Sequence, residues 1–108
     1  MVGSPNFDYI KKLSDGNTEF EKKIMTVIKR ELPLEIHSYQ ENMKEKEFEE
    51  AAEIIHKIKH KLGIFQMEDA YALALEYEET LRAKDTSLKD KFEIYLGQLE
   101  SFVESCEI

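Results

Sequence analysis

Two histidines and three lysines lie together between His56 and Lys61, in a chain that is otherwise strongly acidic. The 108 residues include 15 Lys and Arg against 23 Asp and Glu, which gives a formal net charge of −8. With about 100° of rotation per residue on a helix, Lys59, His60 and Gly63 lie on the same side as His56. An imidazole is therefore expected at the boundary between core and solvent, with an ammonium one turn away.

This combination suits a nucleophile that carries a phosphoryl group. A neutral imidazole attacks phosphorus through one ring nitrogen, and the charge on the phosphoryl oxygens requires nearby fixed cations. Lys59 would supply one such cation, so reversing its charge is expected to slow transfer without unfolding the protein. The sequence contains no P-loop, no dinucleotide-binding glycine pattern and no kinase glycine-rich loop. The phosphoryl group is thus expected to come from another protein.

His56 and His60 also have the i, i+4 spacing with which two imidazoles on one helix can bind zinc or copper. Glu49 or Glu53 could add an oxygen ligand. A structural site normally has four ligands, however, no cysteine lies nearby in the sequence, and three interleaved lysines repel a dication. We therefore expect no metal site and no cofactor bound by the chain itself. We assign no role to the third histidine, His37.

Apolar residues recur at helical spacing in four long segments, and no segment alternates as a half-buried strand does. The first long helix is expected to start at Thr18, where Thr18 and Glu21 have the pattern of a capping box. Pro33 is expected to kink this helix without ending it. The apolar stripes are Phe20, Ile24, Val27, Ile28, Leu32, Ile36, Tyr39 and Met43; then Phe48, Ala51, Ala52, Ile55, Ile58 and Leu62; then Ala70, Leu73, Ala74, Tyr77 and Leu81; and finally Leu88, Phe92, Tyr95, Leu99, Phe102 and Val103.

These segments predict an all-α fold, an antiparallel up-down-up-down four-helix bundle. A short extra helix is expected over Phe7–Leu13, and the third long helix over about Glu68–Lys84. The fourth is expected to begin at the cap signal in Ser87–Asp90. Paired carboxylates such as Glu78–Glu79 are placed on solvated faces opposite the apolar stripes.

The length fits a single domain over residues 1–108, large enough for a core without disulfides or metals. The acidic balance argues against binding to nucleic acid or to an anionic membrane surface. No apolar run resembles a signal peptide or a membrane span, and the lone cysteine, Cys106, cannot form a disulfide within the chain. We expect a cytoplasmic monomer, with no catalytic thiol at Cys106.

The segment Ala52–Lys59, an apolar run followed by His-Lys-Ile-Lys, resembles the histidine-containing phosphotransfer (HPt) domains of multistep two-component phosphorelays, whose pattern is His-x-Leu-Lys. The resemblance covers nearly the whole chain. Leu13–Phe20 is similar to the family's upstream Leu-Ser-Asp-Gly-(Asn/Asp)-x-x-Phe turn, a long helix precedes the histidine, and a later helix has a Glu near position 78. By this resemblance His56 is the phosphoacceptor, and Lys59 helps to neutralise its phosphate.

The chain departs from the family pattern at two positions. The family usually has Gly or another small residue four positions after the phosphoacceptor, where this chain has His60, and Gly ten positions after it, where this chain has Gln66. His60 could crowd a docking partner or add a contact to the phosphate, and Gly63 could take the place of the small residue. Gln66 is expected to weaken a left-handed turn that Gly would favour.

The resemblance implies a phosphorelay intermediate without kinase activity of its own. It would accept a phosphoryl group on His56 from a receiver-domain aspartyl phosphate and pass it to another receiver. The implied partners are response-regulator receiver domains or a hybrid histidine kinase, with Mg²⁺ held by the receiver. Lys57, His60, Lys61 and Gly63 are expected to contact that partner. The alternative is a non-catalytic four-helix adaptor, in which the basic segment binds an acidic protein and His56 is never phosphorylated.

Overall fold

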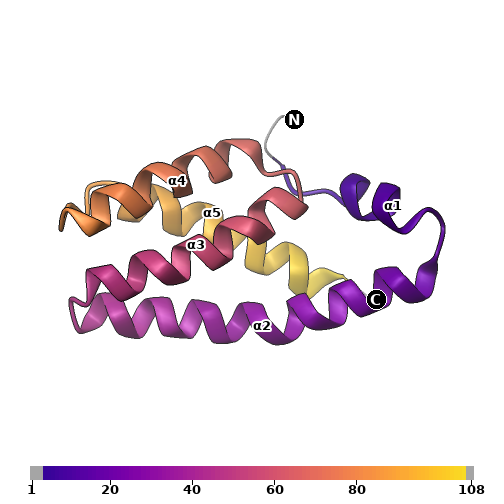
Figure 1. Cartoon of the computed structure of the whole chain (residues 1–108), viewed down its shortest axis with the longest axis horizontal. Helices are drawn as coiled ribbons and strands as arrows, with labels where there is room; N and C mark the ends of the chain where they lie inside the picture. Colours follow the sequence, from indigo (N-terminus) through magenta and orange to yellow (C-terminus); the bar gives the residue numbers. More distant parts are fainter. Residues whose placement is uncertain (1–3, 107–108) are drawn as a thin grey trace.

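Five helices make up most of residues 4–106, the part of the chain that the computed structural model describes (Figure 1). Residues 1–3 and 107–108 of the predicted single domain lie outside this part. No β-strand occurs among residues 4–106, so the all-α prediction is confirmed there. The helices are α1 (Asp8–Ser14), α2 (Thr18–Lys44), α3 (Phe48–Ile64), α4 (Glu68–Arg82) and α5 (Lys89–Ser105).

Helix α3 packs against two neighbours, α2 on one side and α4 on the other, and α5 packs against both α4 and α2. Figure 1 shows α3 between α2 and α4, with α5 behind them. The molecule measures 44 × 26 × 19 Å, and its long axis follows the 27-residue helix α2, which continues through Pro33 without ending, as predicted. None of the described helices is long and apolar enough to cross a membrane.

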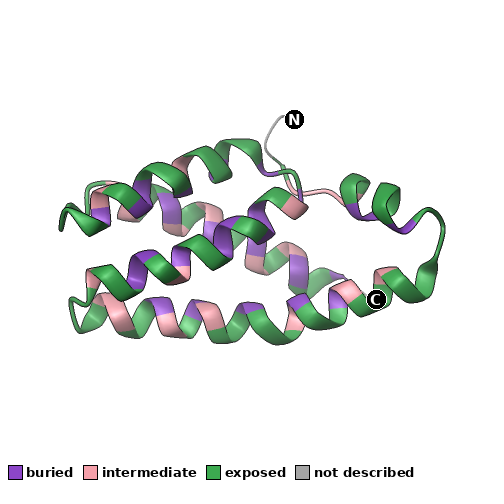
Figure 2. Cartoon of the chain, viewed as in Figure 1, coloured by how far each residue is buried: buried purple, intermediate pink, exposed green. Residues whose placement is uncertain are grey.

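The core is a single cluster of apolar side chains from all five helices. Figure 2 shows that buried residues recur at intervals along α2, α3 and α4. The predicted stripe of α3 is confirmed from its second turn onward, and that of α4 at four of its five positions. In α5 three of the six predicted residues are buried and the other three are half-buried, while Leu96, which the stripe omits, is buried. The fully or nearly buried members of these three stripes are Ala51, Ala52, Ile55, Ile58, Leu62, Ala70, Ala74, Tyr77, Leu81, Phe92, Leu99 and Val103.

The stripe predicted along α2 is wrong in its first turns. Phe20 and Val27 are 38% and 39% exposed, whereas Met25, which the predicted stripe omits, is fully buried. In Figure 1 the first turns of α2 extend past the end of α3, so less of their surface is covered. Met25 begins the buried row that continues through Ile28, Leu32, Ile36 and Tyr39.

The start of α2 is fixed by two side-chain hydrogen bonds that differ from the predicted capping box. The helix begins at Thr18 as predicted, but Asn17 is the cap, and its Oδ1 accepts a hydrogen bond from the Phe20 N–H at 3.1 Å. Asn is at least as good a cap as Thr. The Glu21 carboxylate instead accepts a hydrogen bond from the Ser14 hydroxyl at 3.1 Å, which ties the end of α1 to the first turn of α2.

Two buried tyrosines connect α2, α4 and α5. The hydroxyl groups of Tyr39 and Tyr77 lie 2.8 Å apart, and Tyr39 also donates to the carboxylate of Glu93 at 2.9 Å. Burial raises the pKa of both phenols, that of Tyr77 to about 12. Both therefore stay neutral at physiological pH, as buried donors should.

Helices α2, α3 and α4 each end in a left-handed turn that contains no glycine. The turn residues Lys46, Gln66 and Lys84 have φ angles of 58°, 58° and 64°. After α3, the N–H of Met67 donates to the carbonyl oxygen of Leu62 at 2.9 Å, which is the long bond of a Schellman motif. The left-handed turn at Gln66 therefore forms although a side chain is present.

We expect Gln66→Gly to stabilise the protein by roughly 0.5–1 kcal/mol, because glycine adopts a positive φ without the steric cost of a Cβ. Gln66 is exposed, so no packing is lost. Gln66→Ala is the matched control, since alanine keeps the Cβ and the strain. Urea denaturation followed by circular dichroism measures the three free energies of unfolding. Equal stability of the two variants would contradict this explanation.

Candidate functional site

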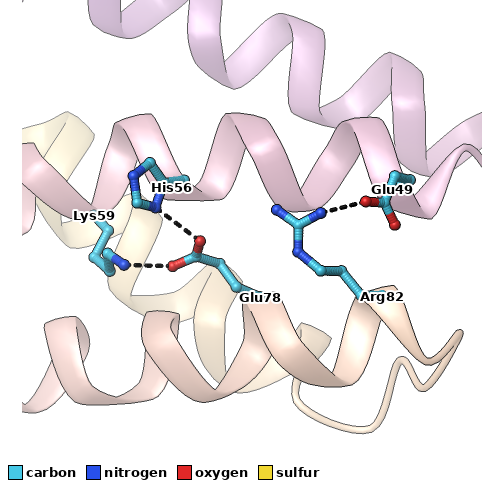
Figure 3. Close-up of polar contacts among 5 residues, drawn as sticks. All are labelled: Glu49, His56, Lys59, Glu78 and Arg82. Carbon is cyan, nitrogen blue, oxygen red and sulfur yellow. Dashed lines mark hydrogen bonds and ion pairs between the residues drawn. The ribbon is translucent and has the colours of Figure 1, made fainter.

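Glu78 connects α4 to two side chains of α3 through one carboxylate (Figure 3). Its Oε1 atom lies 2.9 Å from Nδ1 of His56, and its Oε2 atom lies 2.7 Å from Nζ of Lys59. His56 and Lys59 are three residues apart, so they lie on one side of the helix as the spacing predicts. The structure therefore brings the predicted nucleophile and the predicted cation to one carboxylate.

The contact with Glu78 determines which ring nitrogen of His56 is free. A carboxylate only accepts hydrogen bonds, so Nδ1 carries the ring proton and donates a hydrogen bond to Oε1. The lone pair of the neutral ring is then on Nε2, which points away from Glu78 in Figure 3. The His56 side chain is 54% exposed, so a partner can reach this nitrogen.

Lys59 and Glu78 form a buried ion pair. Their residues are 5% and 7% exposed, and the ammonium lies 5.7 Å from the centre of the Tyr71 ring, within cation–π range. Burial of two charges is costly unless they pair closely, so each charge needs the other. Charge reversal at Lys59 would bury two carboxylates together. We therefore expect this change to destabilise the fold, contrary to the prediction made from the sequence.

The three lysines of the basic segment have different surroundings. Lys57 is exposed, whereas Lys61 is 6% exposed. The Lys61 ammonium lies 3.1 Å from the carboxylate of Glu31 and 3.0 Å from that of Glu35, both on α2. Lys61 thus faces α2 while Lys59 faces α4. The structure does not bring Lys61 to the exposed surface beside His56, because two carboxylates of α2 already hold its charge.

His60 and Gly63 continue the row from His56 along α3, and both are exposed. The His60 ring meets the His56 ring edge to face, with centroids 5.0 Å apart and an interplanar angle of 87°. A Cβ at Gly63 would lie 3.5 Å from the Tyr71 ring, in ordinary contact distance. These two predicted partner-binding residues therefore lie at the surface with His56. Among residues 4–106, no group of three or more His, Cys, Asp or Glu side chains could hold a metal ion.

The surroundings of Cys106 give its thiol a packing role. The residue is buried after the end of α5, and its Sγ donates to the carbonyl oxygen of Phe102 at 3.0 Å. Burial raises the pKa of the thiol, although the positive charge of Lys29 opposes this change. A thiol with a raised pKa supplies little thiolate at neutral pH.

Glu78 is the site residue that the helical pattern misplaces. The pattern puts it on a solvated face with Glu79, and this prediction is wrong because Glu78 is buried between α3 and α4. Two signals point to it. Glu78 follows the buried Ala74 by four residues and precedes the buried Leu81 by three, which places it at the edge of the apolar stripe. The family resemblance also includes a Glu near this position.

Comparisons of the chain with protein-family models, with curated proteins and with solved structures found no match. The chemistry around His56 therefore has to be judged from its own geometry.

We expect Glu78→Ala to destabilise the protein by about 3 kcal/mol or more, because it leaves the Lys59 ammonium buried without its carboxylate. Adding Lys59→Met should recover most of this loss, since no buried charge then remains. Urea denaturation of both single variants and the double variant completes a double-mutant cycle. Strictly additive free-energy changes would mean that the two charges do not depend on each other.

Proposed function

We propose that this protein is a phosphorelay intermediate, a monomeric cytoplasmic carrier with no ATP-dependent kinase activity. It accepts a phosphoryl group on His56 from the aspartyl phosphate of one receiver domain and passes it to another. One observation carries this proposal: an exposed imidazole whose Nδ1 donates to a buried, ion-paired carboxylate. The resemblance to HPt domains favours the same function.

From the ring of His56, the transfer needs a free Nε2 and a stabilised ring charge. The Nε2 lone pair of His56 forms a bond to phosphorus while the bond between phosphorus and the aspartyl oxygen breaks, and the carboxylate leaves with the electron pair. The ring then carries phosphorus on Nε2 and a proton on Nδ1, and thus a positive charge beside the Glu78 carboxylate. In the second transfer an aspartate oxygen of the next receiver attacks phosphorus, and Nε2 leaves with its electron pair.

Glu78 and Lys59 act on opposite charges of this intermediate. The carboxylate fixes the tautomer of His56 and stabilises the positive ring. The Lys59 ammonium, one turn along α3, would act on the negative phosphoryl oxygens with the part of its charge that Glu78 leaves uncompensated. The ion pair holds both groups in place before the partner arrives, so little reorganisation is needed during transfer. By the resemblance, Mg²⁺ would be supplied by the carboxylates of the receiver domain.

We also propose that α2 to α5 form the antiparallel up-down-up-down bundle typical of such carriers. The three-residue links at 45–47 and 65–67 and the packing of α3 against both α2 and α4 support this arrangement. It would leave His56 on an open helix surface. Lys57, His60 and Gly63 would then surround the approach of the receiver.

The adaptor alternative depends on free positive charge, and little is available. Lys59 and Lys61 are both buried against carboxylates, which leaves Lys57 as the exposed lysine of this segment. Electrostatic attraction to an acidic partner is therefore weaker than the sequence suggests. Binding of receivers without any phosphorylation would nevertheless favour the adaptor.

The first test is phosphorylation by a purified, phosphorylated receiver domain. Wild-type protein, His60→Gln and His37→Gln should acquire phosphate that is labile in acid and stable in alkali, whereas His56→Gln should acquire none. His37 lies on α2, outside the site, and is exposed, so it is the matched control for loss of a surface histidine. Labelling of His56→Gln, or no labelling of folded wild-type protein by any of several receivers, would overturn the proposal.

The second test addresses Glu78. Glu78→Gln keeps an oxygen that can accept from Nδ1 but removes the negative charge, so we expect the rate of phosphoryl transfer to fall by about 100-fold or more. Rapid-quench kinetics with saturating receiver measures this rate, and circular dichroism checks the fold. An unchanged rate in folded protein would show that the carboxylate charge has no part in transfer.

A further inference from the structure

We propose that His56 and His60 together form a zinc-binding site on the surface of α3, and that zinc bound there blocks the nucleophilic nitrogen. The second part rests on the proposed function. The two residues lie four positions apart on one helix, both are exposed, and their rings are in edge-to-face contact with centroids 5.0 Å apart. Two imidazoles at this spacing can bind one metal ion from a single helix face.

The hydrogen bond of His56 prepares its ring for a metal. Histidines that bind zinc usually donate their other ring N–H to a carboxylate, which fixes the tautomer and makes the ligating nitrogen more basic. Glu78 Oε1 meets Nδ1 of His56 at 2.9 Å, and Nε2 lies on the side of the ring away from Glu78. The arrangement that favours attack on phosphorus is thus also one that favours zinc.

The neighbouring lysines oppose a dication less than their number suggests. The charge of Lys59 is compensated by Glu78, and that of Lys61 by two carboxylates of α2. Only Lys57 among the three is exposed, and the chain as a whole has a net charge of −8. The electrostatic objection raised by the sequence therefore applies mainly to one residue.

Two imidazoles leave part of the zinc coordination sphere to water. No group of three or more His, Cys, Asp or Glu side chains among residues 4–106 could hold a metal ion, so water would complete the coordination of zinc at this pair and the site would be open and exchangeable. Imidazole prefers zinc over magnesium, which takes oxygen ligands. Zinc on Nε2 would occupy the lone pair that forms the bond to phosphorus, so metal and phosphoryl group exclude each other.

The binding test uses isothermal titration of ZnCl₂ into the whole protein at pH 7 and 0.15 M NaCl. Wild-type protein and the His37→Gln control should bind one zinc per chain, and MgCl₂ should give no signal. His56→Gln and His60→Gln should each lose the binding, and Glu78→Gln should weaken it roughly 10- to 100-fold. Retained binding by His60→Gln, a stoichiometry of one zinc per two chains, or no binding by wild-type protein would overturn the proposal.

A competition experiment separates failure of this inference from failure of the proposed function. With a phosphorylated receiver, zinc should lower the labelling rates of wild-type protein and of His37→Gln, each measured against its own zinc-free rate. The rate of His60→Gln, whatever its zinc-free value, should not respond to zinc, because this variant loses half of the zinc site. Zinc-resistant labelling of wild-type protein would refute the zinc block and leave the phosphotransfer proposal intact. Zinc binding to a protein that no receiver labels would retain the metal site and reject the relay.

Discussion

The buried carboxylate of Glu78 is the constraint on which the site depends. A charge removed from water needs compensation at short range, and here Lys59 provides it from the facing helix. That requirement fixes the rotation of α3 relative to α4, because the lysine and the glutamate must meet. Once they meet, the second carboxylate oxygen reaches His56 without further adjustment. One buried carboxylate is thus shared by the cation of the facing helix and the exposed histidine, and its contact with Nδ1 selects the tautomer of that histidine.

Buried alanines lie on both of the helices that Glu78 connects. Ala51 and Ala52 of α3 and Ala70 and Ala74 of α4 are all fully buried, and the distance between packed helices decreases with the size of the side chains at the contact. A short separation is needed for the Glu78 side chain to span the gap. The packing of the core and the chemistry of the surface are therefore linked through the α3–α4 interface.

Most of the fold can be predicted from the sequence, because helical spacing reports directly on burial wherever a helix is covered along its length. The confirmed stripe of α3 illustrates this. The same pattern fails at Phe20, in the turns of α2 that extend past the end of α3, and at Val27, which lines an open groove beside His60 and Ile64 of α3. Periodicity alone cannot reveal which turns remain uncovered. Likewise the cap moves by one residue to Asn17, since two adjacent side chains can both serve and only the backbone conformation decides between them.

The site is harder to predict, because charge patterns do not show which charges are paired in three dimensions. His56 and Lys59 can be found from their spacing on one helix, which is local information. Glu78 and the environment of Lys61 depend on contacts between helices that are distant in sequence, where a charged residue at the edge of an apolar stripe can equally be solvated or buried against an opposite charge.

The arrangement divides the imidazole of His56 into a fixed side and a free side. Nδ1 is bound to a carboxylate that the core holds in place, and Nε2 remains open to whatever approaches α3. A nucleophile on an exposed helix would ordinarily lose precision through rotation of its side chain, and the hydrogen bond to Glu78 removes that freedom without covering the ring.

The same exposure makes Nε2 available to any electrophile of suitable chemistry, whether phosphorus or a metal ion. Selectivity must then come from the neighbours of the ring. The charge of Lys59 is compensated by Glu78 and therefore favours an anion over a cation only weakly, whereas His60, in contact with the ring, would offer a second ligand to a metal ion. In the proposed relay, His60 would therefore be the neighbour that lets a metal ion compete for the exposed nitrogen.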